Sequence, residues 1–192
     1  ARATNTIAEG EVMQLANLGN CDLNETAYRE VIRCKTALLF EAASHTGAIL
    51  AHQRTKAIND EQIEAMRLFG LHFGMAYQLL DDWLDYRGDS KSMGKNVGDD
   101  LAEGKLTLPL IHALKNAATD DQAGVRDAIE NKKVAALPSI LRIVDKCGGL
   151  DYTQACARQE IETALQCLEH IPDNDYRQAL VQLSHYSLSR LG

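Results

Sequence analysis

Four polar residues that stand close together in the sequence could hold a metal ion or act on a phosphate. Gln78, Asp81, Asp82 and Asp85 occur in the run Gln-Leu-Leu-Asp-Asp-Trp-Leu-Asp. In an α-helix, which turns about 100° per residue, all four fall within a sector of roughly 100°. Crowded carboxylates repel one another, and Mg²⁺ relieves this repulsion because it prefers one or two carboxylates together with phosphates and water. The pattern predicts a magnesium site at Asp81, Asp82 and Asp85, with a solvated acidic helix face as the alternative.

A glycine-punctuated segment that contains lysines follows this run. Within residues 88–105, Lys95 and Lys105 each come directly after a glycine. Glycine lets a backbone approach a phosphate closely, and lysine supplies a point charge. The segment is not a Walker A loop, because five residues separate Gly98 from Gly104 and Leu106 stands where Ser or Thr would bind Mg²⁺. The pattern indicates a mobile segment that could hold a phosphate, with a flexible polar loop as the alternative.

The pair Lys35-Thr36 lies within an expected helix over residues 25–50, in a mostly apolar stretch. A lysine at such a position can carry its ammonium group along the apolar surface to solvent. The ammonium group can instead point into a cavity toward an anionic ligand. The residues around Lys35 allow both arrangements.

Helical periodicity dominates the rest of the chain. Apolar residues recur at spacings of three and four, and strict alternation typical of strands is hard to find. In the expected helix over 60–86, one apolar stripe runs from Ile63 through Phe73 and Tyr77 to Leu84. Further helices are expected over 6–18, from about Thr107, and over 120–131, 136–147, 151–171 and 173–191. The fold class is therefore all-α, a bundle of long helices with short connections.

Composition narrows the function classes. The 192 residues carry 20 Lys and Arg against 27 Asp and Glu, a net charge of −7. This acidic balance argues against nucleic-acid binding, which depends on cationic side chains that neutralise phosphates. No stretch approaches the ~18 consecutive apolar residues of a membrane-spanning helix. Five cysteines without a Cys-x-x-Cys pair indicate reduced thiols, so we expect a cytoplasmic protein without transmembrane segments.

Taken together, these motifs resemble the trans-type polyprenyl diphosphate synthases, and the resemblance covers essentially the whole chain. It is carried by Lys35-Thr36, by Gln78-Leu-Leu-Asp81-Asp82-x-x-Asp85-Tyr86, by Gly94-Lys95-x-x-Gly98-x-Asp100-Leu-x-x-Gly104-Lys105-x-Thr107-Leu-Pro109, and by Glu9-Gly10-Glu11-x-x-Gln14-Leu15.

The resemblance implies an isoprenoid synthase-type bundle of long helices around a central cavity. It implies a Mg²⁺-dependent prenyltransferase that condenses isopentenyl diphosphate head-to-tail onto an allylic diphosphate. The product would be a long-chain polyprenyl diphosphate, a precursor of quinone side chains, and the enzyme would be a homodimer.

The resemblance also implies residue roles. Asp81 would hold a Mg²⁺ that bridges to the allylic diphosphate, with Asp82 and Asp85 in support. Lys35, Lys95 and Lys105 would bind the diphosphate as it leaves. As further catalytic residues, Thr36 and Gln78 would turn oxygen atoms toward the allylic carbocation.

One departure from the family pattern is large. The family's first aspartate-rich motif, the arginines after it and the isopentenyl diphosphate site have no counterpart here. We therefore expect residues 1–192 to be the C-terminal part of a single all-α domain whose N-terminal helices are missing, and expect this part alone to be inactive. Two alternatives are a non-catalytic helical subunit or scaffold of the same fold, and a terpene cyclase-like relative.

Overall fold

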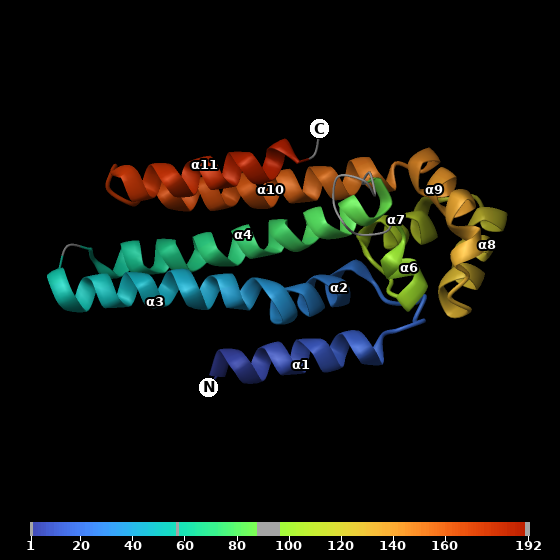
Figure 1. Cartoon of the computed structure of the whole chain (residues 1–192), viewed down its shortest axis with the longest axis horizontal. Coiled ribbons are helices and arrows are strands. Elements are labelled where there is room, and N and C mark those ends of the chain that lie inside the picture. Colours follow the sequence, from blue (N-terminus) through green and yellow to red (C-terminus); the bar gives the residue numbers. More distant parts are fainter. Residues whose placement is uncertain (1, 57, 88–96, 191–192) are drawn as a thin grey trace. The chain divides into compact units, whose positions relative to one another are not determined.

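The computed structural model describes residues 2–56, 58–87 and 97–190, and this part of the chain contains helices and turns but no strand. Figure 1 shows the elements, which are α1 (Arg2–Ala16), α2 (Glu25–Ile32), the π-helical turn η1 (Arg33–Ala37), α3 (Leu38–Thr55), α4 (Asp60–Arg87), α6 (Asp99–Glu103), α7 (Leu108–Asn116), α8 (Thr119–Glu130), the 3₁₀ turn η2 (Val134–Ala136), α9 (Leu137–Lys146), α10 (Gly149–Glu169) and α11 (Asp175–Ser189). The all-α prediction is confirmed.

The observed helices lie close to the expected ones, and two of the differences concern the predicted site residues. The helix expected over 25–50 runs from Glu25 to Thr55 but contains the π-helical turn η1 in its middle. The short helix α6 lies in the segment expected to be a loop. Left-handed glycines bound it on both sides, Gly98 with φ 88° and Gly104 with φ 77°. Glycine adopts this conformation without a β-carbon penalty, so the same glycines that suggested a mobile loop also delimit a helix.

The chain divides into two compact units, which are described separately. Unit 1 contains residues 1–10, 32–78 and 156–192, and unit 2 contains residues 11–31 and 79–155. Helices α1, α4 and α10 each contribute residues to both units.

The core of unit 1 is formed by long helices that lie side by side (Figure 1). Phe69, Phe73 and Ala76 of α4 pack with Ile161, Ala164 and Leu168 of α10, and residues of α3 and α11 pack against this cluster. The apolar stripe predicted on α4 is therefore largely correct. Tyr77 is the exception, since it is 44% exposed and lies at the edge with its ring 5.4 Å from that of Phe40.

Shorter helices build unit 2. Helices α7, α8 and α9 contact one another, and α6 contacts α8. Their buried residues include Leu101, Leu108, Val125, Ile140 and Val144. Pro109 is the second residue of α7, where its missing N–H costs no helical hydrogen bond.

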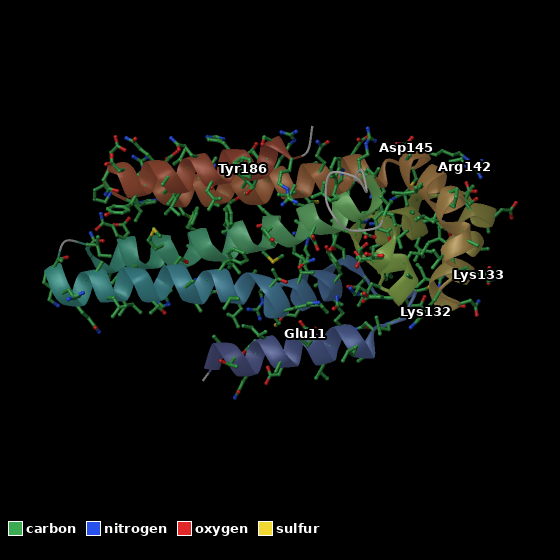
Figure 2. All side chains as sticks on the ribbon, viewed as in Figure 1. Glu11, Lys132, Lys133, Arg142, Asp145 and Tyr186 are labelled. Atoms are coloured by element: carbon green, nitrogen blue, oxygen red, sulfur yellow. The ribbon has the colours of Figure 1, made fainter. Side chains whose placement is uncertain are left out.

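Two aromatic side chains of α11 are exposed at the surface. Tyr176 and Tyr186 of α11 are 85% and 68% exposed, and Figure 2 labels Tyr186 on that helix. In the described part of the chain, no helix is both long and apolar enough to cross a membrane.

Candidate active site

In unit 1, the predicted residues Thr36 and Gln78 meet directly. Thr36 lies in the π-helical turn η1 and Gln78 lies on α4. The Thr36 hydroxyl donates a hydrogen bond of 2.7 Å to the Gln78 side-chain oxygen. Lys35, next to Thr36, is half-buried, as are both partners of this hydrogen bond. The two catalytic residues expected to present oxygens together are thus joined, although 42 positions separate them in the sequence.

In unit 2, Asp82 is buried and has a buried partner. Asp82 is only 3% exposed. Its carboxylate accepts a hydrogen bond of 2.5 Å from the Tyr28 hydroxyl of α2. Burial, together with the charge of Asp82 and this hydrogen bond, raises the pKa of the Tyr28 hydroxyl well above its usual value, so the phenol keeps its proton. Tyr28 therefore orients one aspartate of the run.

Asp85 accepts hydrogen bonds at the start of α6. The backbone N–H groups of Asp99 and Asp100 each donate to its carboxylate at 3.2 Å, and the Gly98 N–H donates to its backbone carbonyl at 2.9 Å. Burial raises the pKa of the Asp85 carboxyl to about 7, and the charges of Asp100 and Asp99 act in the same direction. The two backbone donors oppose this shift. Asp85 thus joins the end of α4 to the segment that follows it.

Lys105 lies within this acidic region. Its ammonium group is 3.2 Å from Asp100 and 2.8 Å from Glu103. Burial raises the pKa of the Asp100 carboxyl, Lys105 opposes the shift, and the charge of Asp81 adds to it. The pKa of Lys105 is raised, because burial is outweighed by the carboxylates of Glu103 and Asp100. Lys105 therefore remains charged beside several carboxylates.

The carboxylates of this region are the kind of ligand that magnesium prefers. In the described ranges, no three His, Cys, Asp or Glu side chains are arranged to hold a metal ion. Asp82 and Asp85 are turned toward Tyr28 and the α6 backbone. Mg²⁺ is commonly bound by one or two carboxylates that share it with substrate phosphates, so the carboxylates present fit a shared ion.

Some of the predicted site residues meet within a single unit. Within their own units, Thr36 and Gln78 are in contact, and Asp85 and Lys105 both lie beside Asp100. Lys95 falls outside the described residues, as does the loop segment 88–96. Lys35 and the aspartates belong to different units.

Sequence reasoning missed Tyr28 as a functional residue. It lies seven positions before Lys35 on the same stretch of helix, and the sequence pattern there predicts an ordinary core residue. Nothing in the local pattern indicates that its hydroxyl meets a carboxylate 54 positions later. The contact depends on how α2 packs against the end of α4 within unit 2.

In the described residues, the aspartate run lies at the end of the long helix α4, and the lysine-threonine pair lies in the π-helical turn of a helical protein. The sequence model of the polyprenyl synthetase family matches residues 1–144. The chain belongs to the polyprenyl synthetase family.

Curated relatives agree with this membership. The chain is 42% identical over 191 residues to octaprenyl diphosphate synthase of Haemophilus influenzae, covering 99% of this chain and 56% of that protein. It is 44% identical over 185 residues to a geranyl-diphosphate-specific all-trans-nonaprenyl-diphosphate synthase of Rhodobacter capsulatus, covering 96% of this chain and 55% of that protein. The chain thus spans little more than half the length of these relatives.

Solved structures show the same fold. A decaprenyl diphosphate synthase from Rhodobacter capsulatus superposes with a TM-score of 0.90 at 37% identity, covering 100% of this chain and 58% of that one. A polyprenyl synthase from Caulobacter crescentus, complexed with calcium and isoprenyl diphosphate, has a TM-score of 0.90 at 38% identity with the same coverage. The isoprenyl-synthase fold predicted from the motifs is confirmed.

Proposed function

We propose that this chain carries the allylic-diphosphate half of a prenyltransferase that condenses isopentenyl diphosphate head-to-tail onto an allylic diphosphate. The product is a long-chain polyprenyl diphosphate that serves as a quinone side-chain precursor. Support comes from relatives named for octaprenyl and nonaprenyl products. The observation that carries the proposal is the arrangement of the aspartate run. Protein donors hold the carboxylates of Asp82 and Asp85. The third aspartate, Asp81, lies close enough to Asp100 for its charge to raise the pKa of that carboxyl.

In this proposal the aspartates have unequal roles. Asp81 is the residue that would hold Mg²⁺ at the allylic diphosphate. Asp82 and Asp85 support it, because Tyr28 and the α6 backbone hold their carboxylates in fixed orientations. Bound Mg²⁺ supplies positive charge that stabilises the diphosphate as the carbon–oxygen bond breaks.

The lysines act on the diphosphate of the substrate, and the side-chain oxygens act on its allylic carbon chain. Lys35, Lys95 and Lys105 bind the departing diphosphate. Thr36 and Gln78 present oxygen atoms to the allylic carbocation, and their mutual hydrogen bond limits the rotation of both side chains. Preorganised dipoles of this kind stabilise a developing charge without reorganising during the reaction.

Several broader features belong to the same proposal. Residues 1–192 form the C-terminal part of a single all-α synthase domain in a cytoplasmic enzyme. The enzyme is a homodimer, and Val12 and Leu15 of α1, which are 64% and 65% exposed, give an apolar surface that a second copy would cover. Its partners are allylic diphosphate and isopentenyl diphosphate.

A joined protein tests the activity. We define it as this chain preceded by the N-terminal part of the Haemophilus influenzae octaprenyl diphosphate synthase that the chain does not span. We expect it to incorporate radiolabelled isopentenyl diphosphate in the presence of Mg²⁺ and an allylic diphosphate. Asp81→Asn should lower kcat by about 10²-fold or more, as expected for the loss of a preorganised electrostatic group.

The alternative of a non-catalytic subunit predicts a different result. A folded joined protein that incorporates no isopentenyl diphosphate under these conditions contradicts the prenyltransferase proposal and favours a scaffold role. Glu169→Gln, an exposed substitution on α10, serves as the charge-matched control and should leave the rate unchanged.

A further inference from the structure

The π-helical turn η1 is a single interruption of the helical stretch between Glu25 and Thr55. The Leu38 N–H donates to the Arg33 carbonyl five residues earlier, and the residues at both ends of the turn have ordinary helical dihedrals. The sequence Arg-Cys-Lys-Thr-Ala contains no proline or glycine that would enforce the irregularity. Single π-helical turns are rare and are frequently found at functional sites. Contacts from other helices must therefore hold this turn.

Two glycines from other helices lie directly against the backbone of η1 in unit 1. A β-carbon on Gly10 of α1 would lie 2.5 Å from the Lys35 backbone nitrogen and 2.9 Å from the Cys34 carbonyl carbon. A β-carbon on Gly74 of α4 would lie 2.6 Å from the Ala37 Cα. Real β-carbons do not approach other atoms this closely, so any other residue at either position must displace the turn or its neighbour.

The same surface of α4 also contacts the side chains of the turn. Gln78 follows Gly74 by one helical turn and accepts the hydrogen bond from Thr36. The close approach at Gly74 thus sets the separation at which Thr36 and Gln78 meet. A shift of α4 away from η1 lengthens that hydrogen bond.

We infer that Gly10 and Gly74 are positioning residues of the reaction: by lacking a β-carbon, they hold the π-helical turn that places Lys35 and Thr36. This inference rests on the proposed function for its consequence in catalysis. Its structural part, that the two glycines maintain the turn, stands on the contacts of unit 1 alone.

The chain supplies two matched controls. Gly70 of α4 is packed as tightly, since its β-carbon would overlap Ser44 Oγ and the Phe40 carbonyl oxygen, but these atoms belong to the regular helix α3. Gly47 of α3 has no atom within 4 Å of such a β-carbon. Gly70→Ala therefore tests tight packing away from η1, and Gly47→Ala tests a glycine substitution in open space.

Amide hydrogen exchange on the 192-residue chain provides the structural readout. In Gly10→Ala and Gly74→Ala we expect the amides of residues 33–38 to exchange at least about tenfold faster than in the wild type. Gly70→Ala should accelerate exchange near residues 40–45 and leave residues 33–38 unchanged. Gly47→Ala should stabilise α3, because alanine favours a helix more than glycine does at an open position. Each variant is therefore also made in the Gly47→Ala background, so that exchange is compared between folded proteins.

Kinetics of the joined protein provide the functional readout. Small misplacements of reacting groups cost up to about 10²-fold in rate, so Gly10→Ala and Gly74→Ala should lower kcat by about tenfold or more. We expect KM for isopentenyl diphosphate to change less than about threefold, and Gly70→Ala to keep the wild-type kcat.

Three results would overturn the inference: unchanged exchange at residues 33–38 in both variants, wild-type kcat despite faster exchange there, or a kcat loss in Gly70→Ala equal to that in Gly74→Ala. A wild-type joined protein that incorporates nothing overturns the proposed function instead. The exchange contrast between Gly74→Ala and Gly70→Ala still decides the structural part in that case.

Discussion

Two buried tyrosines of unit 2 differ in the hydrogen bonding of their hydroxyl groups. The Tyr28 hydroxyl donates to Asp82, whereas the Tyr86 hydroxyl makes no hydrogen bond of normal geometry to a described residue. Each residue is 3% exposed. A hydroxyl that serves a buried carboxylate stabilises the fold, whereas removal of an unsatisfied buried hydroxyl is close to neutral.

We therefore predict that Tyr28→Phe lowers the free energy of unfolding by about 2 kcal/mol, because Asp82 loses a buried donor. Tyr86→Phe should change it by less than about 0.5 kcal/mol or stabilise the chain. Urea-induced unfolding of the 192-residue chain measures both values. Equal effects of the two substitutions would show that the Tyr28–Asp82 hydrogen bond contributes nothing specific.

At the scale of elements, Glu25 links α2 to α10 within unit 2. It accepts hydrogen bonds of 2.8 Å from the Arg29 Nε and from the Tyr152 hydroxyl. Burial raises the pKa of Glu25, but the hydrogen bonds from Arg29 and Tyr152 and the charges of Arg29 and Lys115 outweigh it, so the pKa lies below its usual 4.5.

The lowered pKa predicts an acid-dependent loss of stability. Because the folded chain holds Glu25 ionised more strongly than the unfolded chain, this contribution is complete above pH 4.5 and is lost as the pH falls through the lowered pKa. We expect Glu25→Gln to reduce the fall in Tm between about pH 5.5 and pH 3, because the group that takes up the proton is gone. Thermal unfolding across this range measures the effect, and Glu169→Gln should leave the pH profile unchanged.

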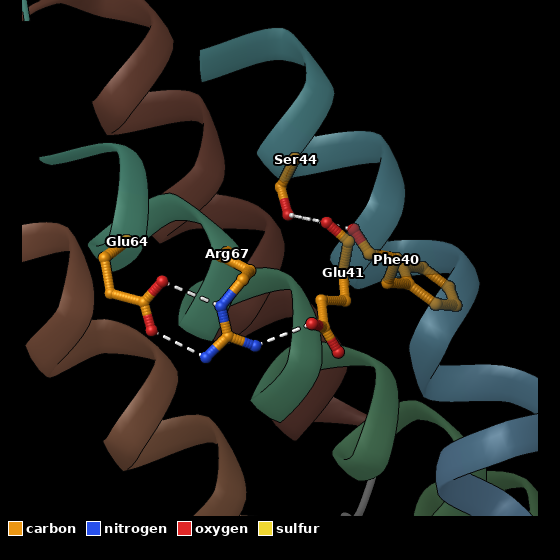
Figure 3. A network of polar contacts seen from close by, with 5 residues as sticks. All are labelled: Phe40, Glu41, Ser44, Glu64 and Arg67. Atoms are coloured by element: carbon orange, nitrogen blue, oxygen red, sulfur yellow. Dashed lines mark hydrogen bonds and ion pairs between the residues drawn. The ribbon is translucent and has the colours of Figure 1, made fainter. Parts of the chain in front are cut away.

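Helices α3 and α4 are joined by Arg67, which lies between two glutamates (Figure 3). Its guanidinium contacts Glu41 of α3 at 2.6 Å and Glu64 of its own helix at 2.6 Å. The Glu41 side chain is 15% exposed, whereas that of Glu64 is 53% exposed. The two ion pairs therefore differ in how strongly solvent screens them.

We predict that Arg67→Met lowers the free energy of unfolding by roughly 2 kcal/mol, because it leaves the Glu41 carboxylate mostly buried without its cation. Glu64→Gln should cost less than about 0.5 kcal/mol, as is usual for exposed pairs. Chemical denaturation measures both. A larger effect for Glu64→Gln than for Arg67→Met would contradict the assigned importance of the contact between α3 and α4.

At the scale of the whole molecule, the chain contains one aspartate-rich run and spans 56% of the length of the Haemophilus influenzae relative. A diphosphate carries several negative charges, and Asp81 with its neighbours adds more. We predict that the 192-residue chain alone incorporates isopentenyl diphosphate at least about 10²-fold more slowly than the joined protein, because electrostatic groups that act in the transition state are missing. Comparable incorporation by the two proteins in the radiolabel assay would contradict this prediction.

Much of this architecture was visible in the sequence because its signals are local. Apolar residues at helical spacing gave the positions of α4, α7, α8 and α9 to within a few residues. The placement of Gln78 and the three aspartates on one face follows from the angle per residue of an α-helix. The motifs also indicated the family, and residues 1–144 match its sequence model.

The remaining features were decided by contacts between segments far apart in the chain. The exposure of Tyr77, the partner of Asp82 and the capping of α6 by Asp85 each depend on which neighbour fills the adjoining space. The five residues of η1 would form ordinary α-helix by their own preferences. Only the tertiary structure places Gly10 and Gly74 against that turn, because whether a backbone can approach another at van der Waals distance is a property of two packed helices and not of either sequence alone.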